Sequence, residues 1–282
     1  MTASMFARSS RGSQQPAHEL VMLDPALATK WLERNRHNRN LRLSKVDQYA
    51  RDMAAGKWQF NGDPIRFAVN GSMLDGQHRC HAVVRSGVTV QVLVVYNLAA
   101  DSQDTMDIGA ARLMSDQLIL AGEANGSMVA AILRRLVAYQ AGFRSFDGGA
   151  KNPTHAEMRE YLEAHPTVRS AAEVANKAKR FLPCSPSMVG VAYHLCSQVN
   201  GEQANQFFVT QLIEGIGLRA ADPARVLYKR LNDMGTARGR TNADDTLRYI
   251  FLAWNAFRTG RSLTRLQAPR GGWSSTNFPE PL

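Results

Sequence analysis

The sequence contains no long hydrophobic run. Its longest candidate, residues 88–95, is interrupted by Thr89 and Gln91, and no run approaches the ~20 residues that cross a bilayer. A membrane-spanning helix is therefore not expected. The N-terminal residues are polar or small and lack the apolar core of a signal peptide, so we expect residues 1–17 to form a disordered leader.

Cysteine is also scarce. The three cysteines, Cys80, Cys184 and Cys196, form no CxxC pair. An odd number without metal-ligand spacing argues against a disulfide framework and against a zinc site. Reduced thiols of this kind are typical of a cytoplasmic protein, which is the expected location.

Acidic residues are too few to balance the basic ones, and the net charge is +10. Residues 1–120 carry 14 Lys/Arg against 11 Asp/Glu, residues 121–215 carry 9 against 8, and residues 216–282 carry 11 against 5. A basic C-terminal stretch is typical of nucleic-acid binding and makes DNA the expected partner, although a solubilising surface is the alternative. The arginines that we expect to follow a phosphate backbone are Arg238, Arg240, Arg258, Arg261 and Arg265.

Hydrophobic periodicity predicts an α+β fold, with an all-α fold as the alternative. Strands are expected at residues 19–23, 65–69, 73–74 and 88–96, the last of them central because it is rich in β-branched residues. Asp24 is expected to cap a helix that begins at Pro25, and Ser44 to cap a second one. A third helix should follow Gly76, with Cys80, Val83 and Val84 on its core face, and end at Gly87.

From residue 127 onward the pattern is helical, which predicts an N-terminal domain over 18–122 and an all-α domain over 123–282. Thr154 and Glu157 have the spacing of a capping box. A helix-turn-helix could lie over residues 154–180, although that region is almost neutral. Helices are expected at residues 128–140, 154–164, 168–181, 187–199, 202–214, 223–234 and 242–258.

The sharpest local feature is the turn Asp75-Gly76-Gln77-His78-Arg79 between a strand and a helix. Gly76 would allow a sharp bend and the close approach of an anion. Backbone N–H groups at the start of a helix attract negative charge, and His78 and Arg79 would add side-chain donors. Asp75 could hold Mg²⁺ or a substrate hydroxyl. A plain strand-to-helix connection is the alternative, and a metal pair of His78 with His81 lacks a third ligand.

This turn and several other segments resemble the ParB/sulfiredoxin superfamily. The resemblance covers roughly residues 18–122 and implies that Gly76, Gln77, His78 and Arg79 hold the phosphates of a nucleotide. Members include CTP-hydrolysing partition clamps, ATP-using sulfiredoxins, free-serine kinases and DNA-associated proteins with a DGQHR motif. The matching pieces are Asn38-Arg39, residues 49–58 (YARDMAAGKW), Asp63-Pro64-Ile65, Leu74-Asp75-Gly76-Gln77-His78-Arg79 with Ala82, and residues 107–112 (DIGAAR).

Two departures narrow the resemblance. Sulfiredoxins carry a cysteine where this chain has Gln77, so reduction of a sulfinic acid is not expected. Partition proteins end the turn with two arginines, where this chain has His78-Arg79. The turn of this chain is more similar to that of the kinases and the DGQHR-type proteins. Separately, the C-terminal segment around Trp254 resembles the ends of phage-type proteins that join such a domain to helices.

The resulting hypothesis is a nucleotide-binding, DNA-associated protein that acts as an NTPase or a nucleotide-dependent switch, with ATP or CTP as ligand and Mg²⁺ as its companion. Arg39, Asp107 and Arg112 would support the phosphates, Asp75 would act as base, and His78 would stabilise the transition state. One alternative is a phosphotransferase or a nucleic-acid-modifying enzyme that uses the same site, and the other is a DNA-binding module without enzymatic activity. A homodimer is compatible with all three. Arg79→Ala is expected to abolish phosphate binding and to leave the fold stable.

Overall fold

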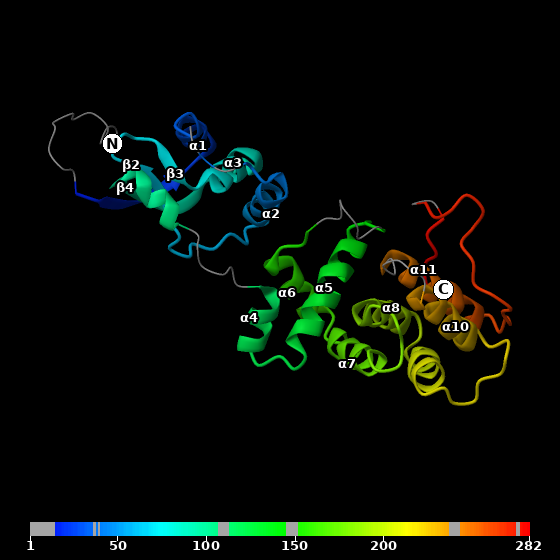
Figure 1. Cartoon of the computed structure of the whole chain (residues 1–282). Helices are drawn as coiled ribbons and strands as arrows, with labels where there is room; N and C mark the ends of the chain where they lie inside the picture. The colour runs from blue at the N-terminus through cyan, green and yellow to red at the C-terminus, as the bar shows by residue number, and fades with distance from the viewer. Residues whose placement is uncertain are drawn as a thin grey trace. The chain divides into compact units, whose positions relative to one another are not determined.

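The computed structural model describes residues 15–35, 38, 40–106, 113–144, 152–236, 243–274 and 277–282 (Figure 1). The chain divides into two compact units, residues 1–110 and residues 111–282. Each unit encloses its own hydrophobic core. The described part of the first unit combines a four-stranded sheet with helices, whereas that of the second is helical. The α+β architecture that the sequence predicts is therefore confirmed.

The sheet of the first unit has the strand order β1-β4-β2-β3. Strand β4 lies inside the sheet, as its β-branched sequence predicts. It pairs antiparallel with β1, where Ala17 lies opposite Tyr96, and parallel with β2, which pairs antiparallel with β3. The strands are β1 (Ala17–Leu23), β2 (Ile65–Ala68), β3 (Met73–Asp75) and β4 (Val90–Leu98).

Three α-helices pack on the sheet and share its core. They are α1 (Pro25–Leu32), α2 (Leu43–Ala54) and α3 (Gln77–Ser86), and the short 3-10 helix η1 (Ala100–Thr105) follows β4. Asp24 caps α1 as expected, with its carboxylate accepting the Leu27 N–H at 2.7 Å. Side chains of both sheet and helices fill the core, among them Trp31, Val46, Met53, Ile65, Phe67, Cys80, Val83, Val92 and Val94.

Two local predictions in this unit are wrong. Ser44 does not cap α2, because the helix already begins at Leu43 and Arg42 holds the extended N-cap position. Val84 is 42% exposed and lies outside the core. The buried face of α3 instead includes Arg79, which lies about 140° around the helix from Val84 at about 100° per residue. The buried side of α3 thus includes a charged residue that an apolar pattern leaves out, and it does not include Val84.

The second unit is built around α5 and α8, which contact each other and most of the remaining helices (Figure 1). The capping box of Thr154 and Glu157 at the start of α6 is confirmed by reciprocal hydrogen bonds of 2.7 and 3.1 Å. The helices are α4 (Met114–Leu120), α5 (Gly126–Gln140), α6 (His155–Ala164), α7 (Val168–Ala178), α8 (Pro186–Val199), α9 (Gly201–Ala204), α10 (Pro223–Thr236) and α11 (Ala243–Arg258).

A π-helix, η2 (Asn205–Ile213), continues α9 without a break. The neighbouring residues Phe207 and Phe208 of this helix are both fully buried. Both rings lie against Trp254 of α11, at centroid distances of 5.8 and 6.3 Å. Within the described residues, no helix has the length and apolar character needed to cross a bilayer.

Candidate functional site

The turn between β3 and α3 bends at Gly76. This glycine has a φ of +108°, in the left-handed region that side chains disfavour. A Cβ at this position would also lie only 2.8 Å from Cγ1 of Ile65. Glycine is therefore required here by backbone conformation and by packing against β2. The structure has the strand, glycine and helix that the sequence predicts.

Asp75 uses both carboxylate oxygens within the fold. Its Oδ1 accepts the backbone N–H of Gly76 at 2.6 Å, and its Oδ2 accepts from Arg66 at 2.7 Å and from Arg79 at 3.2 Å. The side chain is about four-fifths buried. Asp75 is thus a local organiser that joins β2, β3 and α3.

Arg79 is buried, with 7% of its surface exposed. Its guanidinium donates to the backbone carbonyl of Pro64 at 2.7 Å and to that of Asp63, and its Nη1 lies 3.4 Å from the Asp63 carboxylate. These contacts tie the segment before β2 to α3. Contrary to the expectation from the sequence, Arg79→Ala is therefore expected to destabilise the fold, because the carbonyls of Asp63 and Pro64 would lose a charged donor.

His78 and Gln77 connect the turn to the segment between α1 and α2. The backbone N–H of Arg42 donates to Nε2 of His78 at 3.1 Å, so this nitrogen acts as the acceptor. The Asn35 amide donates to Oε1 of Gln77 at 3.0 Å. Both side chains are less than a tenth exposed. The turn is therefore held by β2, by the segment before β2 and by the segment between α1 and α2.

A chain of amides surrounds the same turn. Asn38 donates to Oδ1 of Asn35 at 2.6 Å and to the carbonyl of Met73 at 3.1 Å, and Gln103 donates to Oδ1 of Asn38 at 2.9 Å. We call the four side chains Asn35, Asn38, Gln77 and Gln103 the amide cluster. It gathers groups from the α1–α2 segment, from α3 and from η1 beside the beginning of α3.

This arrangement limits what the turn can do. Since Asp75 and Arg79 neutralise each other within the fold, an anion at the turn would rely on backbone N–H groups of the first turn of α3. Among the described residues, no three His, Cys, Asp or Glu side chains gather to hold a metal ion, and Asp75 already faces two guanidiniums. These residues do not form a Mg²⁺ site by themselves. The supporting residues Arg39, Asp107 and Arg112 lie outside the described residues.

A second candidate site lies in the helical unit, where the backbone N–H of Leu263 donates to the carbonyl of Ala221 at 2.9 Å. This bond joins residues 218–222 to residues 259–266, and we call the two segments the arginine loops. Arg219, Arg261 and Arg265 lie within two residues of the bonded pair and are all exposed. None of the three forms an ion pair with another described residue.

The other arginines predicted to contact nucleic acid do not belong to the arginine loops. The guanidinium of Arg258 donates to the side chain of Gln203 and lies 5.7 Å from the centre of the Trp254 ring, so it is part of the packing of α11. Arg238 and Arg240 lie outside the described residues. Arg219 was missed by the sequence argument because it lies 42 positions before Arg261, and only the pairing of the two loops brings them together.

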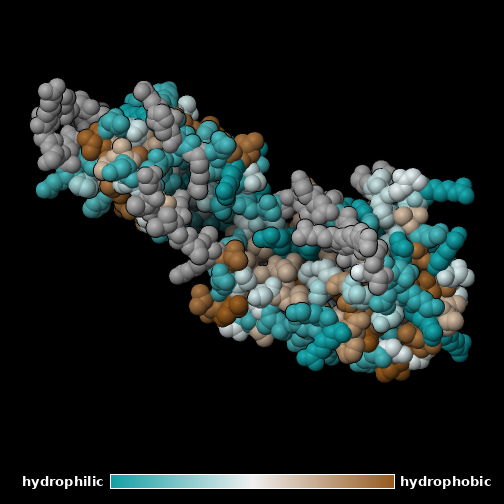
Figure 2. Space-filling model, viewed as in Figure 1, coloured by the Kyte–Doolittle hydropathy of each residue, from teal (hydrophilic) through white to brown (hydrophobic). Residues whose placement is uncertain are grey.

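The surface is mostly polar on the face shown in Figure 2, where hydrophobic residues form small separate patches. Exposed large hydrophobic residues occur in both units, for example Leu20 and Met22 on β1 and Ile119 and Leu120 on α4. Scattered apolar residues of this kind are usual at protein surfaces.

Comparison with known proteins gives no family assignment. No family model matches the sequence, and no curated protein does. A solved structure described as a Pnob8-like ParB-N domain matches 87% of this chain and 97% of its own, with 14% identity and a TM-score of 0.21. A TM-score of this size is below that of chains that share a fold, so the function must be inferred from the residues and contacts described above.

Proposed function

We propose that this protein associates with DNA, and that its helical unit contacts the phosphate backbone through Arg219, Arg261 and Arg265. The observation that carries the proposal is the pairing of the arginine loops, which collects three exposed guanidiniums without ion-pair partners among the described residues. They lie in the part of the sequence with the largest excess of positive charge. Arginine is well suited to phosphate because its planar fork donates two parallel hydrogen bonds.

Phosphate contacts of this kind make binding depend on salt. Each phosphate that is neutralised releases counterions, and the logarithm of the affinity falls with the logarithm of salt concentration by about 0.9 per contact. Three contacts would contribute a slope of roughly −2.7. Removal of the three charges should therefore weaken binding and also flatten its salt dependence, whatever the DNA sequence.

The test measures binding of a fluorescent duplex by anisotropy across a series of salt concentrations. Arg219, Arg261 and Arg265 are replaced together by glutamine, which we expect to reduce the slope by about 2 to 3. A control variant replaces Arg85, Arg159 and Arg169 by glutamine and so lowers the net charge by the same amount. In the folded chain these three arginines bond to Asp47, Gln117 and Glu123 respectively. Equal losses in both variants would mean that only net charge matters and would overturn the proposal.

A nucleotide site at the start of α3 is the second candidate, and the amide cluster favours it. The amide cluster holds the turn in place beside the start of α3, since Asn38 and Gln103 donate both amide hydrogens to members of the cluster or to carbonyls of β3. The donors to phosphate oxygens would then be the backbone N–H groups of the first turn of α3, which follow the left-handed Gly76. The resemblance of residues 74–79 to nucleotide-binding turns supports the same assignment. In this view ATP or CTP, accompanied by Mg²⁺, would bind beside Gly76 and alter the affinity for DNA as a switch or an NTPase.

Calorimetric titration with CTP, ATP and GTP, with and without Mg²⁺, tests this second candidate. We expect at least one nucleotide to bind more tightly than about 1 mM. Asn38→Ala should weaken that binding, whereas Asn70→Ala, in the turn between β2 and β3, should not. Release of inorganic phosphate would identify an NTPase, and transfer of a labelled γ-phosphate to an added hydroxyl compound would identify a phosphotransferase. Lack of heat with all three nucleotides would refute the candidate and leave the DNA proposal intact.

A further inference from the structure

The exposed face of α10 combines positive charge with an aromatic ring. At about 100° per residue, Tyr228 and Lys229 lie on either side of Arg225 and within about 60° of it around the helix. All three side chains are exposed, whereas Leu227 and Leu231 on the opposite side of the helix are buried in the core. We call Arg225, Tyr228 and Lys229 the α10 patch.

The charges of the α10 patch are not neutralised by the described part of the chain. Neither Arg225 nor Lys229 forms an ion pair with another described residue. The carboxylate of Asp222, just before the helix, accepts the backbone N–H of Arg219 at 2.6 Å and so belongs to the preceding turn. The patch therefore attracts an anionic partner.

The α10 patch continues the arginine loops. Helix α10 begins at Pro223, two residues after Ala221, whose carbonyl accepts the N–H that joins the two loops. Arg225 lies in the first turn of this helix and Lys229 one turn further on. Positive charge thus extends from the arginine loops along the N-terminal half of α10, which is a path along which a chain of phosphates can bind.

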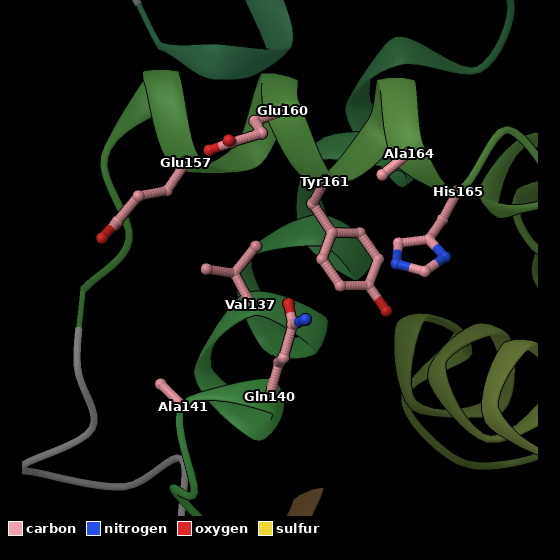
Figure 3. Close-up of a pocket in the computed structure, with 8 residues that line it drawn as sticks. All are labelled: Val137, Gln140, Ala141, Glu157, Glu160, Tyr161, Ala164 and His165. Atoms are coloured by element: carbon pink, nitrogen blue, oxygen red, sulfur yellow. The ribbon is translucent and has the colours of Figure 1, made fainter. Parts of the chain in front are cut away.

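Tyr228 differs from the other described tyrosines of the helical unit. Those four are buried, and the hydroxyl of each lies within hydrogen-bond distance of a polar side chain: Tyr139, Tyr161, Tyr193 and Tyr249. Figure 3 shows Tyr161 on the wall of a cavity between α5 and α6, beside His165. Tyr228 instead has 41% of its surface exposed, and the hydrogen bond that it accepts from Asn232 uses its backbone carbonyl. Packing and hydroxyl bonding therefore account for the other four rings and not for this one.

An exposed ring among cations suits a single strand of DNA better than a duplex. In a duplex each base is stacked between its neighbours, so surface side chains mainly reach phosphates and base edges. In a single strand the bases can stack on an aromatic side chain while cations follow the backbone, and each stacked base contributes roughly five- to a hundredfold in affinity. The ring of Tyr228 would thus be used only with unpaired bases.

We propose that the α10 patch binds single-stranded DNA, with one base stacked on the ring of Tyr228 and neighbouring phosphates paired with Arg225 and Lys229. This inference rests on the proposed contact of the arginine loops with DNA, and it specifies the form of DNA that the helical unit favours. The strand continues from the patch onto the arginine loops.

Binding of the full chain to three labelled probes tests the inference by fluorescence anisotropy. The probes are an oligo(dT) of about 15 nucleotides, an abasic strand of the same length and a duplex of the same length. We expect the oligo(dT) to bind about tenfold more tightly than the abasic strand, which has the same phosphates but no base to stack. Equal affinity for these two strands would overturn the inference and leave the phosphate contacts of the arginine loops intact. Absence of binding to all three probes would refute the proposed function as well.

Variants of the ring locate the stacking. Tyr228→Ala should weaken oligo(dT) binding about tenfold and change binding of the abasic strand and the duplex less than about twofold. Tyr228→Leu keeps a large apolar side chain on the helix and should have the same effect, whereas Tyr228→Phe keeps the ring and should retain affinity within about twofold. Phe60→Ala, which removes an exposed ring of the first unit, is the matched control and should not change binding. Equal losses for oligo(dT) and the abasic strand in Tyr228→Ala would refute stacking.

The cations of the patch are tested through salt dependence. Replacement of Arg225 and Lys229 together by glutamine should flatten the salt dependence of oligo(dT) binding by about 1.4, since each phosphate contact on a single strand contributes about 0.7. The advantage of oligo(dT) over the abasic strand should persist in this variant, because the ring is unchanged. An unchanged salt slope would show that the phosphates bind elsewhere and would refute the site.

Discussion

Arg79 shows how one residue can satisfy a binding motif and a structural need at the same time. Its position in the turn suggests a phosphate ligand, yet its guanidinium donates to the carbonyls of Asp63 and Pro64 and pairs with Asp75. Each hydrogen bond to a charged group contributes about 1.5–3 kcal/mol to stability. The first function of Arg79 is therefore to hold β2, β3 and α3 together.

Arg79→Ala is expected to lower the local stability of the first unit by about 3 kcal/mol, because the carbonyls of Asp63 and Pro64 lose a charged donor. Arg79→Lys should recover only part of this loss, because an ammonium cannot reproduce the planar fork that reaches two carbonyls. Hydrogen exchange of the α3 amides, measured by mass spectrometry, reports the local opening free energy. Unchanged protection in Arg79→Ala would show that these contacts add nothing to stability.

Gly76→Ala should destabilise the same unit by about 2 kcal/mol or more, since it combines a positive φ with a close contact to Ile65. Gly71→Ala is the matched variant, because Gly71 also has a positive φ of +79° but no atom within 4 Å of an added Cβ. Its effect should be limited to about 1 kcal/mol of backbone strain. Hydrogen exchange of the α3 amides compares the two variants. Equal losses of stability would mean that Ile65 moves away from the added Cβ without an energetic cost.

At the level of elements, α8 carries a buried histidine that makes stability depend on pH. Burial, followed by the charge of the nearby His165, lowers the pKa of His194 to about 4. Tyr161, His165, Thr167 and Gln198 surround this ring, and burial raises the pKa of Tyr161 to about 12, so the phenol stays neutral. His194 is thus neutral in the folded protein over most of the range in which it is protonated when unfolded.

The stability of the helical unit should therefore fall as pH drops from about 6.5 to about 4, because the unfolded chain takes up a proton that the folded chain excludes. The fall should reach roughly 1.4 kcal/mol per pH unit within this window and vanish above it. Urea unfolding at a series of pH values measures it, and His194→Gln should flatten the curve. An identical pH dependence in the variant would assign the effect to other groups.

Regular elements were largely predictable because their patterns are local. The caps at Asp24 and Thr154, the left-handed Gly87 after α3 and the central β4 all follow from residue type and spacing. The predicted cap at Ser44 was wrong because α2 begins one residue earlier, at Leu43. The predicted burial of Val84 was wrong because the buried side of α3 extends to Arg79 instead. Short-range patterns do not register either effect.

The candidate sites were less predictable than the elements, since they depend on contacts between distant segments. The turn at residues 75–79 was recognisable, but its links to Arg42, Asp63 and Asn35 span up to 42 positions. Arg219 joined the arginine loops only through the bond between Leu263 and Ala221. The α10 patch likewise depends on which side of α10 the core leaves exposed.

At the level of the whole molecule, the two units have separate cores, and we expect them to unfold separately. Differential scanning calorimetry should show two transitions. Gly76→Ala should lower the midpoint of one, and His194→Gln should shift only the other. A single transition that moves as a whole in both variants would show that the units unfold together.

The π-helix η2 has a consequence for how this chain is aligned with others. In a regular helix each residue advances by about 100°, so the wider winding over residues 205–213 shifts the residues of η2 out of the phase of α9. A relative with ordinary winding there would lack one residue, and a gapless alignment would then match the wrong faces of α10 and α11. Such a gap, placed beside Phe207 and Phe208, would be a footprint by which distant members of the same lineage could be recognised.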